Sequence, residues 1–149
     1  MDLAVGPLTV ELGVYTLFFM KTATVDLAAT KDCRCLAARR AARAITRMYE
    51  ARLRPYGLRA TQFSILAALA LKGATPVSDL AKVLGLERTT LTRSSALLEE
   101  RGWVRGATSE DAREHPLQLT QAGRRTLEAA LPAWQAAQEL VSQRHGGLS

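Results

Sequence analysis

The sequence has few of the residues that build disulfide scaffolds, metal centres or aromatic-rich β folds. Aromatic residues make up 5% of its 149 residues, and there are only two cysteines and two histidines. Cys33 and Cys35 are too close in sequence for an unstrained disulfide, and His115 and His145 lie far apart. These spacings argue against a secreted disulfide scaffold and predict no metal site.

The signatures of common enzyme classes are also missing from the sequence. It has no glycine-rich phosphate loop, no G-x-S-x-G nucleophile elbow and no H-E-x-x-H zinc motif. No pairing of a nucleophile with a base is visible either. We therefore expect neither an enzyme nor a cofactor, and an enzyme is the least favoured function class.

What is present favours one compact, basic, helical domain. Apolar residues are 48% of the chain and charged residues 23%, so a core can form. The abundance of alanine and leucine favours helices over a β-sandwich. The net charge is +6, and arginine supplies 16 of the 20 cations. This charge points first to a polyanion such as nucleic acid, although arginine also forms solvated helix faces.

Residues 1–32 differ from the rest and predict an N-terminal extension. Residues 1–19 contain no Lys or Arg, and residues 12–20 are mostly apolar. Because this run lacks a basic flank and is too short to span a membrane, we expect a cytoplasmic protein without membrane contact. Packing of residues 8–20 as an arm on the body is one interpretation. The other is that translation starts at Met20, or that residues 1–19 are loose.

Three further segments have helical patterns. Apolar residues recur at three- and four-residue steps from Cys35 to Tyr56, and Pro55 and Gly57 end the pattern. Phe63 to Leu71 is apolar nearly all round, which predicts a buried central helix. Residues 120–145 predict one long helix that includes a proline.

The residue spacing in residues 75–104 predicts a helix-turn-helix. Pro76 is placed to open a short helix, whose apolar positions repeat as far as Leu84. Gly85 stands where two helices must turn sharply, and a second helix is predicted from about Glu87 to Arg101.

The N-terminal half of that second helix has a polar outer face suited to DNA. Hydroxyl and guanidinium groups match phosphate oxygens and base edges in a major groove. The residues that we expect to contact DNA are Arg88, Thr89, Thr90, Thr92, Arg93 and Ser94. The alternatives are a surface helix of a bundle or a winged-helix module that binds protein. The zero net charge of residues 86–102 would favour the protein-binding module.

A β-hairpin is predicted after this helix. Apolar residues alternate around Trp103–Arg105 and Leu117–Thr120, on either side of a polar loop. A hairpin that directly follows a helix-turn-helix is the wing of a winged helix. Arg113, near its tip, is placed to enter a minor groove, where negative potential attracts arginine.

The sequence resembles the MarR-type transcriptional regulators from about Cys35 to Leu140. Three motifs carry the resemblance: residues 88–93 (RTTLTR), the Leu98-Glu99-x-Arg101-Gly102 motif and the wing motif Asp111-x-Arg113-x-x-x-Leu117-x-Leu119-Thr120. The resemblance implies a homodimer that reads a pseudo-palindromic operator in double-stranded DNA. It also implies repression relieved by a small ligand or an oxidant, and a role for Asp111 in supporting the wing.

The expected fold class is therefore mainly α with a small β-hairpin wing. Residues 61–119 are predicted to form the winged helix-turn-helix DNA-binding domain, and residues 33–60 and 120–149 a helical dimerisation region. This chain departs from the pattern at Ser95, where the family usually has an apolar residue. It also stops soon after the long helix, where the family usually adds another.

The expected function is a repressor released by a small aromatic or phenolic ligand. Arg43 and Arg47 are the candidates for a ligand pocket. The alternative is a sensor of organic hydroperoxides. In that branch of the family a reactive cysteine stands where Cys35 does, and tyrosine hydroxyls hold its thiolate. Tyr49 aligns with one such tyrosine, whereas Ala60 replaces another.

Overall fold

The computed structural model describes residues 27–108 and 115–145. The chain divides into two units, residues 1–37 and 38–149, and each is considered by itself. The arm predicted for residues 8–20 lies outside the described residues. In chain order the elements are η1 (Ala28–Asp32), α2 (Arg34–Leu53), η2 (Arg54–Tyr56), α3 (Ala60–Lys72), β1 (Thr75–Pro76), α4 (Val77–Leu84), α5 (Arg88–Glu100), β2 (Val104–Gly106), β3 (Pro116–Leu119) and α6 (Gln121–His145).

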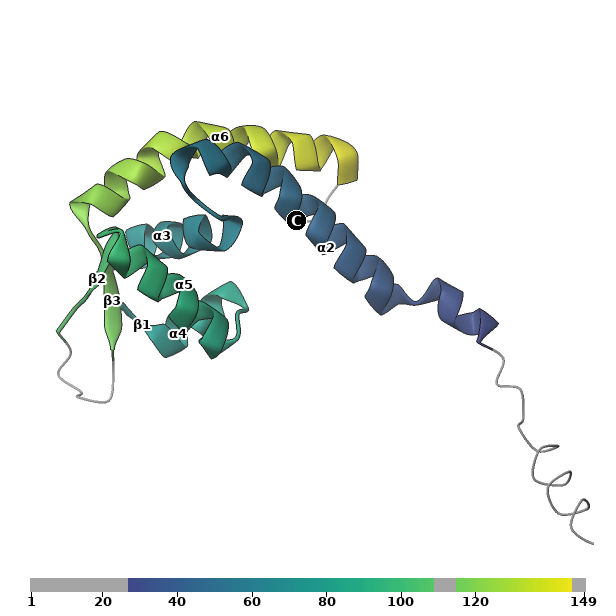
Figure 1. Ribbon diagram of the computed structural model, residues 1–149, viewed down its shortest axis with the longest axis horizontal. Helices are drawn as coiled ribbons and strands as arrows, with labels where there is room; N and C mark the ends of the chain where they lie inside the picture. The colour runs from purple at the N-terminus through teal and green to yellow at the C-terminus, as the bar shows by residue number, and fades with distance from the viewer. Residues whose placement is uncertain (1–26, 109–114, 146–149) are drawn as a thin grey trace, which may run out of the picture. The chain divides into compact units, whose positions relative to one another are not determined.

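This architecture confirms the expected fold class, a mainly helical chain with a small antiparallel sheet (Figure 1). Each predicted helix is present with its ends shifted by a few residues. α6 runs unbroken through Pro132. None of the helices in residues 27–108 and 115–145 has the length and hydropathy that a membrane span requires.

The end of α2 is set by a proline and a glycine, as the sequence predicts. Pro55 lies in the short 3₁₀ turn η2, and Gly57 follows in the left-handed region with φ of 71°. That conformation costs glycine little because it has no Cβ. The Leu58 amide then donates to the Leu53 carbonyl at 3.3 Å, and both leucine side chains are buried.

α3 is the centre of the core and packs against α4, α5, α6 and β3. Phe63, Ile65, Leu66 and Leu69 on α3 are all buried. The prediction that its apolar run is buried is wrong at Leu71, which is 88% exposed. Leu71 lies in the last turn of α3, just before Gly73 ends the helix.

α6 packs against α3 through small residues and one aromatic stack. Ala130 and Ala137 of α6 are completely buried, and alanine lets two helices approach closely. Between them, the Trp134 ring stacks on Phe63 with centroids 5.7 Å apart. This packing ties the C-terminal helix to the core within a single chain.

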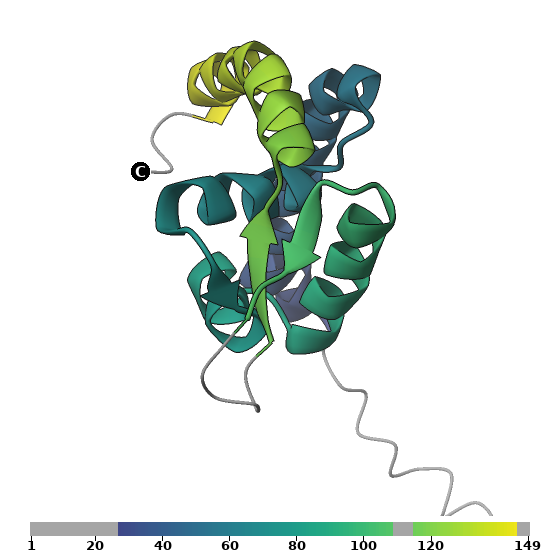
Figure 2. The same cartoon turned by 90° about the vertical axis from the view of Figure 1, so that its left-hand side faces the viewer.

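The sheet contains one strand that the sequence pattern does not predict. β2 and β3 form the expected hairpin, with Val104 opposite Leu119 (Figure 2). β1 pairs with the other edge of β3, giving the order β1-β3-β2. β1 has only two residues, too few for an alternating pattern to be recognised.

Pro76 does not lie in the first turn of a helix, where the sequence pattern predicts it. It ends β1 and is the N-cap of α4, with φ of −57° and ψ of 142°. The ring of proline restricts φ to a value that suits both a helix and a strand, so only the pairing with β3 decides between them.

The junction between the hairpin and α6 depends on Thr120 and Gly123. The Thr120 hydroxyl lies 2.7 Å from the Gly102 carbonyl oxygen and 3.1 Å from that of Trp103, and it accepts the Gly123 amide at 3.0 Å. The Thr120 amide also donates to the Trp103 carbonyl at 3.0 Å. A Cβ on Gly123 would overlap that carbonyl oxygen and lie 2.9 Å from Leu119 Cδ1. Only glycine fits this close contact.

We predict that Gly123→Ala destabilises the protein, although alanine is the better helix former by about 1 kcal/mol. The added Cβ must push the first turn of α6 away from the Trp103 carbonyl. Overpacking of this kind costs about 1–3 kcal/mol, which a urea titration would measure as a lower free energy of unfolding. Gly106→Ala is the control, because a Cβ there meets no atom within 4 Å. Equal stability of the two variants would contradict the prediction.

Candidate nucleic-acid interface

The α4–α5 unit has the geometry of a helix-turn-helix. Gly85 ends α4 in the left-handed region with φ of 61°, as predicted. The Leu86 amide closes the turn by donating to the Ala81 carbonyl at 2.9 Å. Glu87 is the N-cap of α5 in an extended conformation, without a capping hydrogen bond from its side chain. The turn therefore places α5 at an angle to α4 and begins it with exposed residues.

α5 has one face in the core and one in solvent. Leu91, Ser95 and Leu98 are buried at three- and four-residue intervals, and they fix the helix against the core. Five of the six predicted DNA contacts are exposed, and the sixth is half-buried. The exposed residues are Arg88, Thr89, Thr90, Thr92 and Arg93; the half-buried one is Ser94.

The exposed end of α5 is electrostatically suited to an anion. It holds no acidic residue in its first turn, and its amide groups point outward at the positive end of the helix dipole. Glu99 and Glu100 lie in the last turn. The Thr92 hydroxyl donates to the Arg88 carbonyl at 2.8 Å, so that it can offer an intermolecular partner only its acceptor lone pairs.

The buried face of α5 contains one unusual group, the hydroxyl of Ser95. This side chain is 4% exposed, and its oxygen has no hydrogen-bond partner among the described residues. A buried hydroxyl without a partner costs free energy. The departure from the family pattern noted at Ser95 is therefore an energetic weakness in the helix that carries the candidate interface.

The hairpin wing is described only at its base. Arg105 and His115 are exposed there, and the Ala107 amide donates to the Pro116 carbonyl at 2.8 Å. The tip, residues 109–114, lies outside the described residues. Asp111 and Arg113 belong to that tip, so their predicted roles stay predictions.

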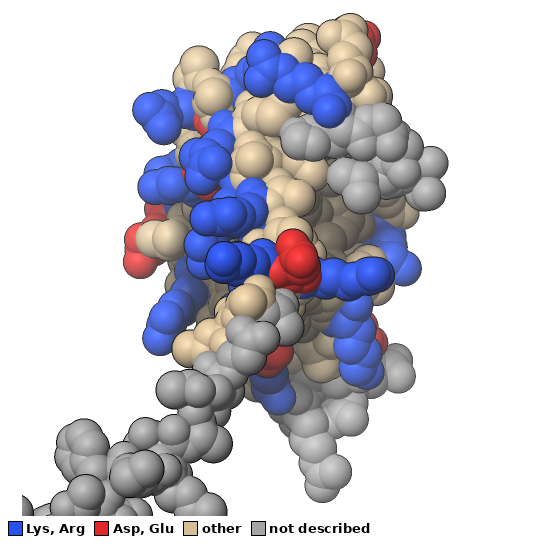
Figure 3. Space-filling view, turned by 90° about the vertical axis from the view of Figure 1, so that its right-hand side faces the viewer, with Lys and Arg blue, Asp and Glu red and all other residues tan. Residues whose placement is uncertain are grey.

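Arginines of α2 contribute to a basic face. Arg39, Arg40, Arg43 and Arg47 are exposed. Figure 3 shows a face of the molecule on which Lys and Arg side chains gather, with few acidic ones among them. Neither Arg43 nor Arg47 lines the cavity that contains Tyr49 or the cleft that contains Arg59.

A small cavity of about 240 Å³ lies among α2, α3 and α6. Three helices each contribute a pair of residues four positions apart: Tyr49 and Leu53, Ala60 and Ser64, and Trp134 and Gln138. Such a spacing places both members of a pair on one helix face, but it does not show which helices meet. The sequence pattern therefore points to Tyr49 but does not show that Ser64, Trp134 and Gln138 are its neighbours.

The chemistry of this cavity combines an aromatic wall with neutral polar groups. Burial raises the pKa of the Tyr49 hydroxyl above its ordinary value of 10, so the phenol is neutral at physiological pH. The Ser64 hydroxyl donates to the Ala60 carbonyl at 3.1 Å. Ala60 lines the same cavity as Tyr49, but its methyl group offers no second hydroxyl.

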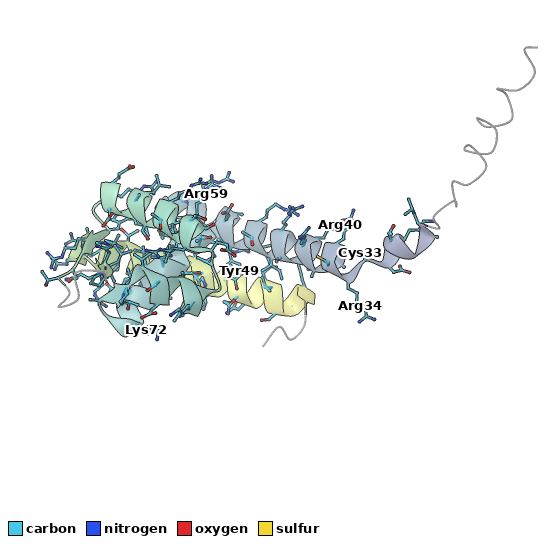
Figure 4. The ribbon with its side chains drawn as sticks, turned by 90° about the horizontal axis from the view of Figure 1, so that it is seen from below. Cys33, Arg34, Arg40, Tyr49, Arg59 and Lys72 are labelled. Carbon is cyan, nitrogen blue, oxygen red and sulfur yellow. The ribbon has the colours of Figure 1, made fainter. Side chains whose placement is uncertain are left out.

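The two cysteines lie in the first unit. Cys35 is the second residue of α2, at the predicted helix start, and Cys33 directly precedes the helix. Both thiols are free and exposed (Figure 4). Tyr49 belongs to the other unit.

A helix-turn-helix followed by a β-hairpin, with helices on either side in the sequence, defines a winged helix-turn-helix protein. Residues 58–115 match the sequence profile of the MarR family. The Mycobacterium tuberculosis transcriptional regulator MosR, solved in complex with DNA, is 42% identical in sequence to this chain. The two structures align with a TM-score of 0.70 over 77% of this chain and 84% of that one. This chain therefore belongs to the MarR family, which places it among transcriptional regulators and not enzymes.

Two other proteins are similar to this chain. The transcriptional repressor CouR, bound to a 23-mer DNA duplex, is 25% identical, with a TM-score of 0.69 over 82% of this chain and 87% of that one. The uncharacterized HTH-type transcriptional regulator YwoH of Bacillus subtilis (strain 168) is 34% identical over 87 residues. That match covers 58% of this chain and 64% of the relative's length.

We predict that Ser95→Ala stabilises the protein by about 1 kcal/mol, since it removes a buried hydroxyl that lacks a partner. The measurement is the urea midpoint of unfolding. Ser64→Ala is the matched control: it makes the same change in helix propensity, but at an exposed hydroxyl that already has a backbone acceptor. If Ser95→Ala gains no more than Ser64→Ala, the buried hydroxyl is not a weakness.

Proposed function

We propose that this chain is a homodimeric DNA-binding repressor that is released from a pseudo-palindromic operator by a small aromatic or phenolic ligand. The observation that carries the proposal is the exposed N-terminal half of α5. There, arginine and threonine side chains face solvent while leucines anchor the opposite face. Such a helix fits a major groove, with guanidinium groups that can bind guanine edges and phosphates.

The wing and the helices supply the remaining parts of this function. In the proposed division, residues 61–119 bind DNA, and Arg113 of the wing enters the adjacent minor groove while Asp111 supports the wing. Residues 33–60 and 120–149 form the dimer. Leu131 on α6 supports this assignment, because a leucine that is 41% exposed on a long helix gains free energy when a second subunit covers it.

Release by a ligand is supported by the Tyr49 cavity. Its indole wall suits an aromatic ring, and the Tyr49 phenol and the Gln138 amide offer donors and acceptors to polar substituents. α3 lines this cavity and also packs against α5, so a ligand there acts on a helix that supports the DNA-reading surface. Arg43 and Arg47 stay candidates for attracting an acidic ligand from the exposed face of α2.

We predict that Arg93→Ala and Arg113→Ala each weaken operator binding. Loss of a base-edge contact by Arg93 should cost about 1–3 kcal/mol, and loss of Arg113 should weaken the minor-groove contact. Gel shifts with operator fragments selected from genomic DNA measure both effects. Arg144→Ala, which removes the same charge at the exposed end of α6, is the control. Unchanged affinity in folded Arg93→Ala and Arg113→Ala would favour the protein-interaction module instead.

We predict that stoichiometric organic hydroperoxide leaves the operator bound. The physical reason is that Ala60 supplies no second hydroxyl beside Tyr49 to hold a thiolate. Gel shifts before and after oxidation test this, with Cys35→Ser as the matched variant. Release in the wild type that disappears in Cys35→Ser would establish the alternative, a thiol-based sensor, and would remove ligand release as the mechanism.

A further inference from the structure

A second cleft, of about 470 Å³, is lined by three arginines from three different elements. Arg54 begins η2, Arg59 is the N-cap of α3 and Arg101 is the C-cap of α5. The cleft shares no lining residue with the Tyr49 cavity. Arg59 directly precedes α3, whereas Tyr49 lies on α2 (Figure 4). These are two distinct hollows at the beginning of α3.

The cleft carries an uncompensated positive charge. Its one acidic lining residue, Glu50, pairs with Arg59 at 3.2 Å, so three cations and one anion give a net charge of +2. The Arg59 side chain is 73% exposed and retains donors that face solvent. A doubly charged anion would neutralise the cleft, whereas a singly charged one would leave a positive charge.

Arg101 is held in position before any ligand arrives. Its guanidinium donates to the Gly57 carbonyl, and its Cζ atom lies over the Trp103 ring at 4.9 Å from the centroid. These two contacts use one of the five N–H donors and leave others free. A guanidinium that is already oriented loses less entropy when it binds an oxyanion.

The cleft also has an apolar part. The core residue Leu58 and the α5 residue Leu97 both line it, and the Leu97 side chain is 50% exposed. A ligand with an apolar body would cover Leu97 while its charged end contacts the arginines. The volume is in the range of pockets that take small metabolites.

We propose that this cleft binds a small phosphomonoester, with its dianionic phosphoryl group on Arg54, Arg59 and Arg101 and its apolar body on Leu58 and Leu97. The three terminal phosphoryl oxygens match guanidinium donors, and the double negative charge matches the net charge of the cleft. A carboxylate offers one charge and two oxygens and fits less well.

Occupancy of this cleft bears on DNA binding, and that part of the proposal rests on the function proposed above. Arg101 caps the C-terminus of α5, while Arg54 and Arg59 belong to the segment between α2 and α3. A phosphoryl group that bridges these residues ties the orientation of the recognition helix to that segment. The cleft is therefore a second regulatory site, which takes a phosphorylated metabolite.

The test is calorimetric titration of the full chain with butyl phosphate, inorganic phosphate and butyrate, which lack the aromatic ring that suits the Tyr49 cavity. We expect butyl phosphate to bind at least tenfold more tightly than either of the others, since only it combines the dianion with an apolar body. Arg54→Gln and Arg59→Gln should each weaken butyl phosphate at least tenfold. Arg144→Gln, an equal loss of charge at the exposed end of α6, should leave the affinity unchanged.

Two results overturn the proposal: butyrate or inorganic phosphate binding as tightly as butyl phosphate, or an affinity for butyl phosphate that is unchanged in both Arg54→Gln and Arg59→Gln. The titration contains no DNA, so it decides on the cleft even if the chain fails to bind an operator. Gel shifts with butyl phosphate then test regulation. An altered operator affinity in the wild type but not in Arg59→Gln supports it, and an unaltered one in both overturns it.

Discussion

The contact between the first turn of α6 and the carbonyl group of Trp103 is the constraint on which the rest of the structure depends. Thr120 and Gly123 bring the first turn of α6 to that carbonyl, at the point where α5 has just ended and the hairpin begins. Because the contact leaves no room for a Cβ at position 123, the wing, α5 and α6 meet in one defined geometry. A shift of α6 therefore displaces the Trp103 carbonyl, which lies at the base of the wing.

α3 connects this junction with the two candidate ligand sites. It packs on α4, α5, α6 and β3, and its first turn lies between the Tyr49 cavity and the arginine-lined cleft. The two hollows differ in chemistry: one is neutral with an aromatic wall, and the other has a net charge of +2. In the two proposals made above, an aromatic ligand and a phosphorylated one act through the same central helix.

Most of the fold follows from local sequence patterns. Helical periodicity, the glycines at positions 57 and 85 and the alternation around the polar loop predict α2 to α6 and the hairpin, because each signal acts within a few residues. Pairing across the chain is different. Local patterns predict neither β1 nor the position of Pro76 in it, because the partner of that segment is β3, some forty residues away.

The sequence by itself determined the class of protein and the residues of the candidate DNA-reading face, since the period of α5 separates Leu91 and Leu98 from Arg88 and Arg93. Only the tertiary structure decided which side chains share a hollow. Arg54 and Arg101 are 47 positions apart, and no periodicity relates them. They line one cleft because the chain turns at Gly57, whose carbonyl accepts a hydrogen bond from the Arg101 guanidinium. This contact joins the end of α5 to the turn before α3, and it depends on the packing of the whole core.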